Sequence, residues 1–387
     1  MHNKQDNKSK LVIGITAYQS IALIPGQLKF LSSYYDVYLL APNHESVVSF
    51  CLAENATHIP IKIERNPSPI KDFVTFFRLL KIFNKLKPDI VNLGTLKISF
   101  LGIIAAWFTG IKNRVYTCRG FRFQDQNGLS RMYLIVFERI ISLLATHIIC
   151  ISNSIAELGI NKKLFNPNKV NVFSKGSSNG INLDVFCTEN IDENIVTKFN
   201  NDYQLKSKFV YGFVGRMVDA KGIVELYHSF DKIYSENINV RLMMVGSFYE
   251  NEINDKNLVL SFNTHPGIIM CGRQPLNLVP TYMSMFNLLV LPTWREGFGN
   301  VLIQAAAMGI PVLSNNITGC KDAVNDGFNG KLIAPRDEAE LTFWMRELYQ
   351  NDSLRLKYAQ NGKTWAQFFD SKVIWKNMLD FYSKCHL

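Results

Sequence analysis

Two cations and a glycine turn in the second half of the chain could bind a diphosphate. Gly215 and Arg216 follow the apolar run Phe209–Val214, and Lys221 comes five residues after Arg216. A glycine lets the backbone approach a ligand closely, a helix N-terminus favours an anion, and two cations neutralise phosphate charge. On its own, the pattern fits an ordinary strand–helix turn with two surface cations equally well.

A second segment could bind a sugar and its phosphates. It combines a carboxylate with a glycine turn that leads into an apolar helix: Glu296, Gly297, Phe298, Gly299 and Asn300. Carboxylates accept hydrogen bonds from hydroxyl groups, and the turn exposes N–H groups to an anion. Gln304 follows Glu296 by eight residues, about two helical turns, which predicts both side chains on one helix face. The alternative is an acid that serves the dipole of an ordinary helix.

Parallel sheets covered by helices are the elements that would position these residues, because short apolar runs alternate with amphipathic segments. The sequence predicts strands at Leu11–Thr16, Val37–Ala41, Ile90–Leu93, Arg114–Thr117, Ile148–Ile151, Phe209–Val214, Val240–Val245, Ile268–Cys271, Leu288–Leu291, Pro311–Ser314 and Lys331–Ile333. It predicts helices at Gln27–Ser33, Ile70–Leu86, Ile223–Glu236, Leu276–Met285, Asn300–Met308 and Trp365–Tyr382. Ligands of such sheets bind beyond the carboxyl ends of the strands, where both chemical segments fall.

A polar, asparagine-rich stretch interrupts this alternation between residues 188 and 206. A length of 387 residues is typical of two domains. We therefore expect an N-terminal domain over 1–187, a linker over 188–206, a C-terminal domain over 207–364 and a C-terminal helix over 365–387.

The charge is concentrated in the first half of the chain. Residues 1–187 hold 22 Lys+Arg and 11 Asp+Glu, which leaves 20 basic and 21 acidic residues in the remainder. The basic half favours an acidic partner. Nucleic acid is one such partner, but no groove-reading motif is present, and we expect none to bind. The apolar content of 47% excludes a disordered chain.

Other features predict a cytosolic protein. The polar start Met1–Lys10 lacks the layout of a signal peptide. Seven scattered cysteines without a C-x-x-C pair favour reduced thiols and no zinc site. The most apolar run, Ile98–Ile111, is shorter than the roughly 20 residues that span a bilayer.

The segment Ile70–Lys87 combines aromatic residues with cations at helical intervals. A basic, aromatic helix of this kind could lie on anionic lipid. A domain helix that buries its aromatic residues and exposes its lysines is the alternative.

Three blocks of the sequence resemble the family 4 retaining glycosyltransferases of the GT-B fold: GSSNGINLDVF, FVGRMVDAKGIVEL and LPTWREGFGNVLIQAAAMGIPVLSNNITGCKDAVNDGFNGKLI. Their order and spacing are also similar to those of the family, and the likeness covers nearly the whole chain. The resemblance implies an α/β protein with two doubly wound Rossmann-like domains that face a central cleft.

The resemblance also implies roles for the second-half residues. Arg216 and Lys221 match the pair that binds the donor diphosphate and stabilises its leaving charge, with Gly215 beside them. Glu296 matches the first acid of an E-x7-E pattern near the transferred sugar, and the backbone of Gly297–Asn300 matches the loop around sugar and diphosphate. Gln304 stands where the family has a second acid that holds the ribose, so we expect altered nucleotide binding.

In the first half, the resemblance is weaker. Gly26 fits a glycine loop that approaches the donor phosphates, although a plain helix-capping turn is the alternative. Arg119 stands where many relatives have a histidine in the acceptor cleft, and an arginine there could hold an acceptor diphosphate. Glu138 also matches a family position, which we assign to the acceptor side.

By resemblance, the chain is expected to transfer a sugar from a UDP-sugar, N-acetylhexosamine or hexose, with retention and without metal or other cofactor. The expected acceptor is a saccharide on undecaprenyl diphosphate, in the assembly of O-antigen, capsule or another surface glycan. The expected location is the inner face of the bacterial cytoplasmic membrane, peripherally bound to its anionic surface. A nucleotide-sugar epimerase of the same fold and a non-catalytic scaffold for glycan assembly are the alternatives.

Overall fold

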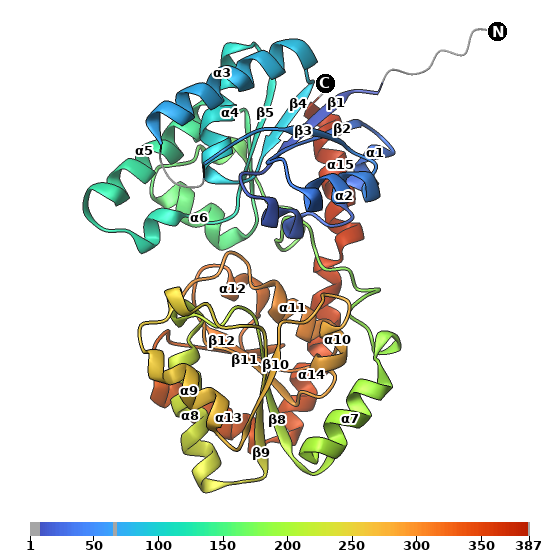
Figure 1. Cartoon of the computed structure of the whole chain (residues 1–387), viewed down its shortest axis with the longest axis vertical. Coiled ribbons are helices and arrows are strands. Elements are labelled where there is room, and N and C mark those ends of the chain that lie inside the picture. Colours follow the sequence, from blue (N-terminus) through green and yellow to red (C-terminus); the bar gives the residue numbers. More distant parts are fainter. Residues whose placement is uncertain (1–7, 65–67, 386–387) are drawn as a thin grey trace, which may run out of the picture. The chain divides into compact units, whose positions relative to one another are not determined.

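The computed structural model describes residues 8–64 and 68–385. The described residues form two compact units, one from residues 8–64, 68–180 and 371–385, the other from residues 181–370 (Figure 1). The chain therefore returns to its first unit at its end. Each unit is built on one sheet of parallel strands with helices around it.

The first unit contains a parallel sheet with the strand order β3-β2-β1-β4-β5-β6-β7. Its strands are β1 Lys10–Gly14, β2 Asp36–Ala41, β3 Thr57–Pro60, β4 Ile90–Leu93, β5 Asn113–Cys118, β6 His147–Cys150 and β7 Val170–Asn171. Its helices are α1 Gln27–Ser32, α2 Glu45–Ala53, α3 Pro69–Leu86, α4 Leu96–Phe108, α5 Gly128–Leu144, α6 Asn153–Asn161 and α15 Ser371–Cys385. The strand order reverses between β1 and β4, and ligands bind at such points in doubly wound sheets.

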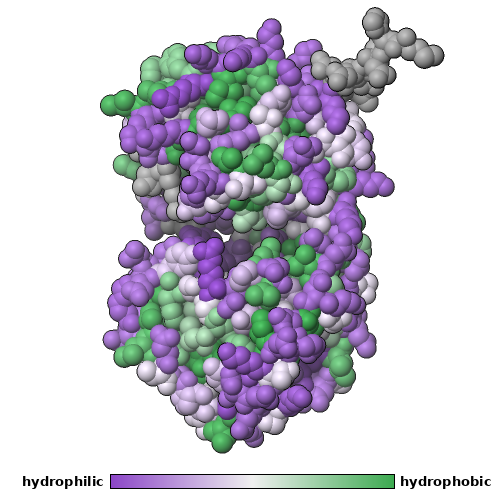
Figure 2. All heavy atoms as spheres, turned by 45° about the vertical axis from the view of Figure 1, so that its right-hand side comes forward, coloured by the Kyte–Doolittle hydropathy of each residue, from purple (hydrophilic) through white to green (hydrophobic). Residues whose placement is uncertain are grey.

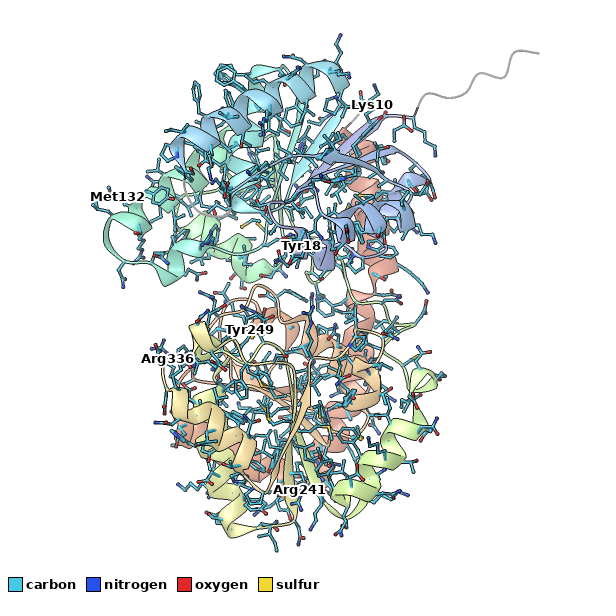
Figure 3. All side chains as sticks on the ribbon, in the orientation of Figure 1. Lys10, Tyr18, Met132, Arg241, Tyr249 and Arg336 are labelled. Carbon is cyan, nitrogen blue, oxygen red and sulfur yellow. The ribbon has the colours of Figure 1, made fainter. Side chains whose placement is uncertain are left out.

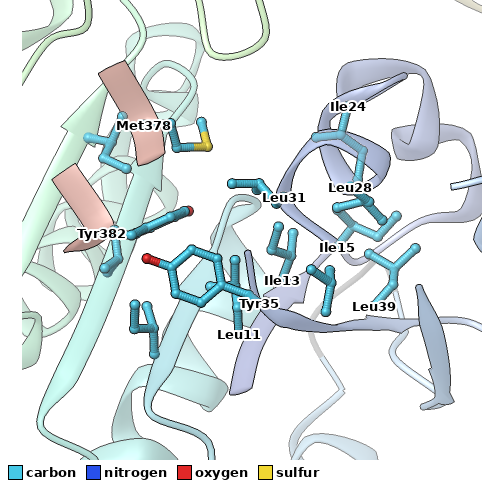
Figure 4. Close-up of a cluster of buried hydrophobic side chains, with 14 of the residues drawn as sticks. Leu11, Ile13, Ile15, Ile24, Leu28, Leu31, Tyr35, Leu39, Met378 and Tyr382 are labelled. Atoms are coloured by element: carbon cyan, nitrogen blue, oxygen red, sulfur yellow. The ribbon is translucent and has the colours of Figure 1, made fainter. Parts of the chain in front are cut away.

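The core of the first unit includes residues from the far end of the chain. Ile374, Met378 and Tyr382, spaced by four on α15, pack with Leu11 and Ile13 of β1 in one buried cluster (Figure 4). The side chain of Asn92 on β4 donates a hydrogen bond of 2.6 Å to the Tyr382 hydroxyl. The final helix is thus an integral part of the first unit.

The second unit contains a parallel sheet with the order β10-β9-β8-β11-β12-β13. Its strands are β8 Phe209–Val214, β9 Val240–Val245, β10 Ile268–Gly272, β11 Leu288–Leu291, β12 Val312–Asn315 and β13 Gly330–Ile333. Its helices are α7 Glu193–Tyr203, α8 Ile223–Glu236, α9 Lys256–Thr264, α10 Val279–Met283, α11 Asn300–Ala307, α12 Cys320–Ala323, α13 Glu338–Gln350 and α14 Asp352–Ala366. All eleven strands expected from the sequence are present, and the α/β prediction is confirmed.

The expected linker over 188–206 is wrong, because this stretch belongs to the second unit and contains α7. The Asp192 carboxylate caps α7 by accepting from the N–H groups of Asn194 and Ile195. Phe199 packs its ring against Tyr282 of α10, with centroids 5.5 Å apart. The polar composition therefore reflects a surface helix rather than a connection.

The domain boundaries also differ from those expected. The first unit ends at Gly180 instead of residue 187, and the predicted single helix Trp365–Tyr382 is interrupted. Helix α14 ends at Ala366 in the second unit, and α15 begins at Ser371 in the first. The amphipathic pattern runs through both helices, so it does not reveal the break.

Candidate functional site

The loops at the carboxyl edge of the second sheet hold the residues expected to bind the donor. β8 leads into Gly215 and Arg216, and β11 leads into the loop of residues 292–299. β9 leads into residues 246–252, which include Tyr249, labelled in Figure 3. Parallel strands bring these loops to one edge, as expected for the ligand site of a doubly wound sheet.

Lys221 and Glu296 form an ion pair in this edge, although they are 75 residues apart in the sequence. The Lys221 Nζ contacts Glu296 Oε2, and each side chain is about one-fifth exposed. The structure thus brings together two of the three expected catalytic residues. Cys320 lies nearby, but burial, followed by the charge of Glu296, raises the pKa of its thiol to about 12, which keeps it protonated.

Backbone contacts hold the two halves of this pair in place. The carbonyl of Ala220 accepts from the Trp294 N–H at 2.9 Å and from the Thr293 hydroxyl at 3.0 Å. Gly222 has a φ of 69°, and a Cβ there would lie 1.9 Å from the Pro292 carbonyl oxygen. Only glycine therefore permits this close approach of the lysine turn to the glutamate loop.

Trp294 adds a side-chain connection between the glutamate loop and α8. Its indole N–H donates to Glu225 Oε1 at 3.0 Å, and the Arg336 guanidinium lies 4.0 Å from its ring centroid. Arg336 follows β13 and is labelled in Figure 3. The loop that carries Glu296 is therefore anchored to two neighbouring elements.

Arg216 is held by the loop after β9. Its Nη1 lies 2.9 Å from Glu252 Oε1, and its guanidinium lies 5.2 Å from the centroid of the Tyr249 ring. The buried Asp219 carboxylate accepts from the backbone N–H and the side chain of Asn254, which fixes the end of this loop. An anion that binds Arg216 must compete with the Glu252 carboxylate.

The glycine turn before α11 differs in part from the expectation. Gly299 is the N-cap of α11 with a φ of 76°, and Asn300 is the first helical residue. Glu296 therefore lies in the loop, and Gln304 lies one helical turn into α11, so the expected shared helix face is wrong. Phe298 is buried with its ring 5.3 Å from that of Phe369, which leaves only its backbone for a ligand.

Arg119 lies at the carboxyl end of β5 in the first sheet. Its Nη1 donates to the Ser178 hydroxyl, and its buried Nε has no partner. Gly94, after β4, packs beneath it, since a Cβ there would lie 3.2 Å from Nε. Burial lowers the pKa of the guanidinium to about 10, so it stays charged at neutral pH. This position suits an arginine that binds an anion.

Glu138 does not lie where an acceptor could reach it. Its side chain is 2% exposed, and its Oε2 accepts a hydrogen bond of 3.0 Å from the Tyr116 hydroxyl. Burial between α5 and β5 raises the pKa of this carboxyl to about 8. The acceptor-binding assignment of Glu138 is corrected to a role in the core, because α5 turns this residue toward the sheet.

Gly26 does not offer its N–H to a donor phosphate in this structure. That N–H donates to Glu54 Oε1 at 2.7 Å, and the N–H of Lys29 donates to Glu54 Oε2 at 2.9 Å. A carboxylate from the end of α2 therefore occupies the N-terminus of α1. The capping alternative is the one that the structure supports.

A recess of about 510 Å³ lies elsewhere in the first unit. Its lining includes Lys87 and Asp89 before β4 and Lys112 and Asn113 at the start of β5. These residues lie at the amino ends of the strands, opposite the edge that holds Arg119. The recess is therefore not part of the candidate site.

No three His, Cys, Asp or Glu side chains among the described residues are grouped so that they could hold a metal ion. None of the helices in this part of the chain is both long and apolar enough to cross a bilayer.

Some residues of the site were not expected from the sequence. Glu252 and Tyr249 contact Arg216, and Trp294 and Glu225 anchor the glutamate loop. Trp294 lies in the same motif as Glu296, so the sequence could have indicated that it belongs to the site. Glu252 lies in a polar loop without any motif, and nothing in the sequence singles it out.

With this geometry established, comparison with known proteins defines the class. Residues 30–184 match the family described as "Glycosyltransferase Family 4", and residues 196–365 match "Glycosyl transferases group 1". The chain belongs to this glycosyltransferase family.

Individual relatives agree with that assignment. The chain is 33% identical over 373 residues to the capsular polysaccharide biosynthesis glycosyltransferase CapM of Staphylococcus aureus, which covers 95% of each protein. It is 27% identical to an Escherichia coli UDP-Gal:α-D-GlcNAc-diphosphoundecaprenol α-1,3-galactosyltransferase, over 70% of this chain and 69% of that one. The solved structure of HepE from Anabaena in complex with UDP superposes with a TM-score of 0.79 at 16% identity, covering 97% of this chain and 100% of that one. The GT-B prediction is thereby confirmed.

Proposed function

We propose that this glycosyltransferase moves a sugar from a UDP-sugar to a saccharide carried on undecaprenyl diphosphate, in the assembly of a capsule, O-antigen or related surface glycan. The observation that carries the proposal is the Lys221–Glu296 pair beside Arg216, at the carboxyl edge of the second sheet. The Escherichia coli relative, which uses UDP-Gal and a diphosphoundecaprenol acceptor, and the UDP bound by HepE support this choice of substrates, and CapM supports a role in capsule synthesis. The transferred sugar is proposed to be an N-acetylhexosamine or a hexose.

The proposed reaction retains the configuration of the anomeric carbon. The acceptor hydroxyl oxygen bonds to that carbon while the bond between the carbon and the diphosphate oxygen breaks. The hydroxyl proton passes to the leaving diphosphate. Such a step needs cations at the diphosphate more than a separate base, and Arg216 and Lys221 are proposed to supply them, which their position at one edge of the second sheet supports. Glu296 is proposed to contact the transferred sugar, and Gln304 the nucleotide ribose.

Two further assignments complete the proposal. Arg119 would hold an anionic group of the acceptor, because its buried Nε has no protein partner.

No metal or other cofactor is proposed, since the two cations can balance the charge of the diphosphate. Activity that is unchanged after exhaustive chelation would agree with this, whereas loss restored by Mg²⁺ or Mn²⁺ would contradict it.

A panel of UDP- and GDP-sugars with a synthetic polyprenyl-diphosphate saccharide tests the proposal. The expected product is the acceptor plus one sugar by mass, with the donor's anomeric configuration by NMR. A mass increase only with GDP-sugars would refute the UDP-sugar donor, and a product of inverted configuration would refute the retaining reaction.

The epimerase alternative makes a different prediction from donor alone. An epimerase would convert the nucleotide sugar into an isomer, whereas a transferase leaves it unchanged without acceptor. The Glu296→Ala variant tests the scaffold alternative in cells. If the protein is a scaffold, glycan output should be unchanged, and if it is a transferase, glycan output should be lost.

A further inference from the structure

A patch of aromatic rings is exposed on helices α3 and α4 of the first unit. We call it the aromatic patch; its exposed rings are Phe73, Phe77, Trp107 and Phe108, and the partly buried ring of Phe76 lies between them. The ring centroids of Phe73 and Phe77 are 4.8 Å apart, and those of Phe77 and Phe76 are 5.6 Å apart. The Phe76 centroid lies 6.0 Å from that of Phe108, which lies 4.9 Å from that of Trp107. The patch is therefore one continuous surface built from two helices.

The aromatic patch is not needed by the core beneath it. The inner face of α3 already buries Thr75, Leu79 and Phe83. Phe73 remains 65% exposed and Phe108 64% exposed. Rings of about 150–250 Å² each leave several hundred square ångströms of apolar surface open, which marks a contact with a partner or a membrane. Apolar residues at the surface of the first unit are coloured green in Figure 2.

The charges beside the patch are almost all positive. Helices α3, α4 and α5 carry seven Lys and Arg against two acids. Of those acids, Asp72 forms a 2.7 Å ion pair with Lys97, and Glu138 is buried. The exposed cations that follow Phe77 on α3 are Arg78, Lys81 and Lys85. The surroundings thus favour an anionic occupant and disfavour a second copy of this basic half.

We propose that the aromatic patch docks onto an anionic lipid bilayer. The rings insert at the boundary between head groups and acyl chains, where tryptophan is enriched, and Arg78, Lys81 and Lys85 lie on the lipid phosphates. The proposal rests on the proposed function in that a lipid-linked acceptor lies in the same bilayer. It goes beyond the basic helix seen in the sequence, because Trp107 and Phe108 of α4 complete the surface.

Sedimentation of the full-length protein with vesicles tests the docking. Wild type should bind vesicles that contain phosphatidylglycerol and bind phosphatidylcholine alone weakly. Phe73→Glu/Phe77→Glu should lower the affinity by about ten-fold or more, because two charges replace inserted rings. Phe343→Glu is the matched control, since this ring on α13 of the second unit is 53% exposed and Phe77 is 52% exposed. It should bind as wild type does.

A second variant tests the cations independently. Arg78→Gln/Lys81→Gln/Lys85→Gln should weaken binding to anionic vesicles by about five-fold per cation at low salt, and reduce its salt dependence. The control replaces three exposed lysines of the second unit, Lys198, Lys206 and Lys232, with glutamine. Equal weakening in both triple variants would show a net-charge effect and refute the patch.

Other outcomes would overturn the proposal outright. Wild type that stays in the supernatant with both lipids, or a double variant that binds as wild type does, refutes docking. A wild-type dimer that dissociates in the double variant, without vesicle binding, would make the patch a self-interface instead. All patch variants should still transfer sugar to a short-chain, water-soluble acceptor. If wild type lacks that activity, the proposed function fails while vesicle binding still decides the docking.

Discussion

Lys221 is the residue whose removal should most affect the reaction, if it stabilises the leaving diphosphate. Lys221→Ala should lower kcat by about 10²–10³-fold, the usual effect of losing one group that stabilises developing charge. The melting temperature should change little, because an ion pair that is partly exposed contributes little to stability. Steady-state kinetics and a thermal melt measure both quantities.

Lys331→Ala is the matched control for Lys221→Ala. Lys331 also lies in the second unit, is 20% exposed and pairs with Asp326 at 3.1 Å. It should keep nearly wild-type turnover. Near-normal turnover in a folded Lys221→Ala protein would remove Lys221 from the mechanism.

Glu252 should act against donor binding, because its carboxylate pairs with Arg216. Exposed ion pairs of this kind contribute about 0.2–1 kcal/mol, so Glu252→Gln should tighten UDP binding by roughly 1.4- to five-fold. Isothermal titration calorimetry measures the change, with Glu250→Gln on the same turn as the control. A dissociation constant that is unchanged or larger would show that Glu252 does not compete with the ligand.

At this scale, the sequence could indicate which residues lie together where the motif is local. Arg216, Lys221 and Glu296 stand in short blocks whose residue types predict a phosphate and sugar site, and the structure brings them to one edge of the second sheet. The sequence could not indicate where a carboxylate far away in the chain pairs with one of the expected site residues. Glu54 is 28 residues from Gly26 and Glu252 is 36 residues from Arg216, and no local pattern links either pair.

At the scale of elements, the packing of α5 on β5 should make stability depend on pH. The pKa of Glu138 is about 8 in the folded protein, against an ordinary value of 4.5. Between these values the folded state keeps a proton that the unfolded chain has lost, so stability decreases as pH rises, by up to about 1.4 kcal/mol per pH unit. Glu138→Gln cannot titrate and should show a smaller loss of melting temperature between pH 5 and 8.

The exposed Glu157 on α6 provides the control for that measurement. Glu157→Gln should keep the wild-type pH dependence. If Glu138→Gln follows the wild-type curve throughout this range, the carboxyl is not protonated in the folded protein.

The same scale shows which elements a sequence can and cannot reveal. Strands such as β8 and β11 are continuous apolar runs, as expected for strands buried on both faces. β3 ends in Pro60 at the edge of the sheet, and only its two central residues are partly buried, so its pattern is weak. α7 was missed because its stability comes from an Asp192 cap and contacts with α10, neither of which needs an apolar composition.

At the scale of the whole molecule, part of the positive charge of the first half of the chain can be assigned to particular helices. The excess of cations predicted for the first half is concentrated, in part, on helices beside the aromatic patch. The number of domains could be predicted from length and alternation. Their boundaries could not, because the chain returns to its first unit through α15 after completing the second.

That return makes the last helix essential for the first unit, although it follows the second unit in sequence. Ending the chain at Asp370 removes Ile374, Met378 and Tyr382, whose burial contributes about 1.5–3 kcal/mol each for residues of this kind. It also leaves the buried Asn92 amide without its acceptor, which costs about 1–3 kcal/mol. Calorimetry should show the first unit melting at a much lower temperature, while the second unit still binds UDP. The exposed Lys376→Ala on the same helix should have no such effect, and a truncated chain that melts like the full-length protein would contradict the role given to α15.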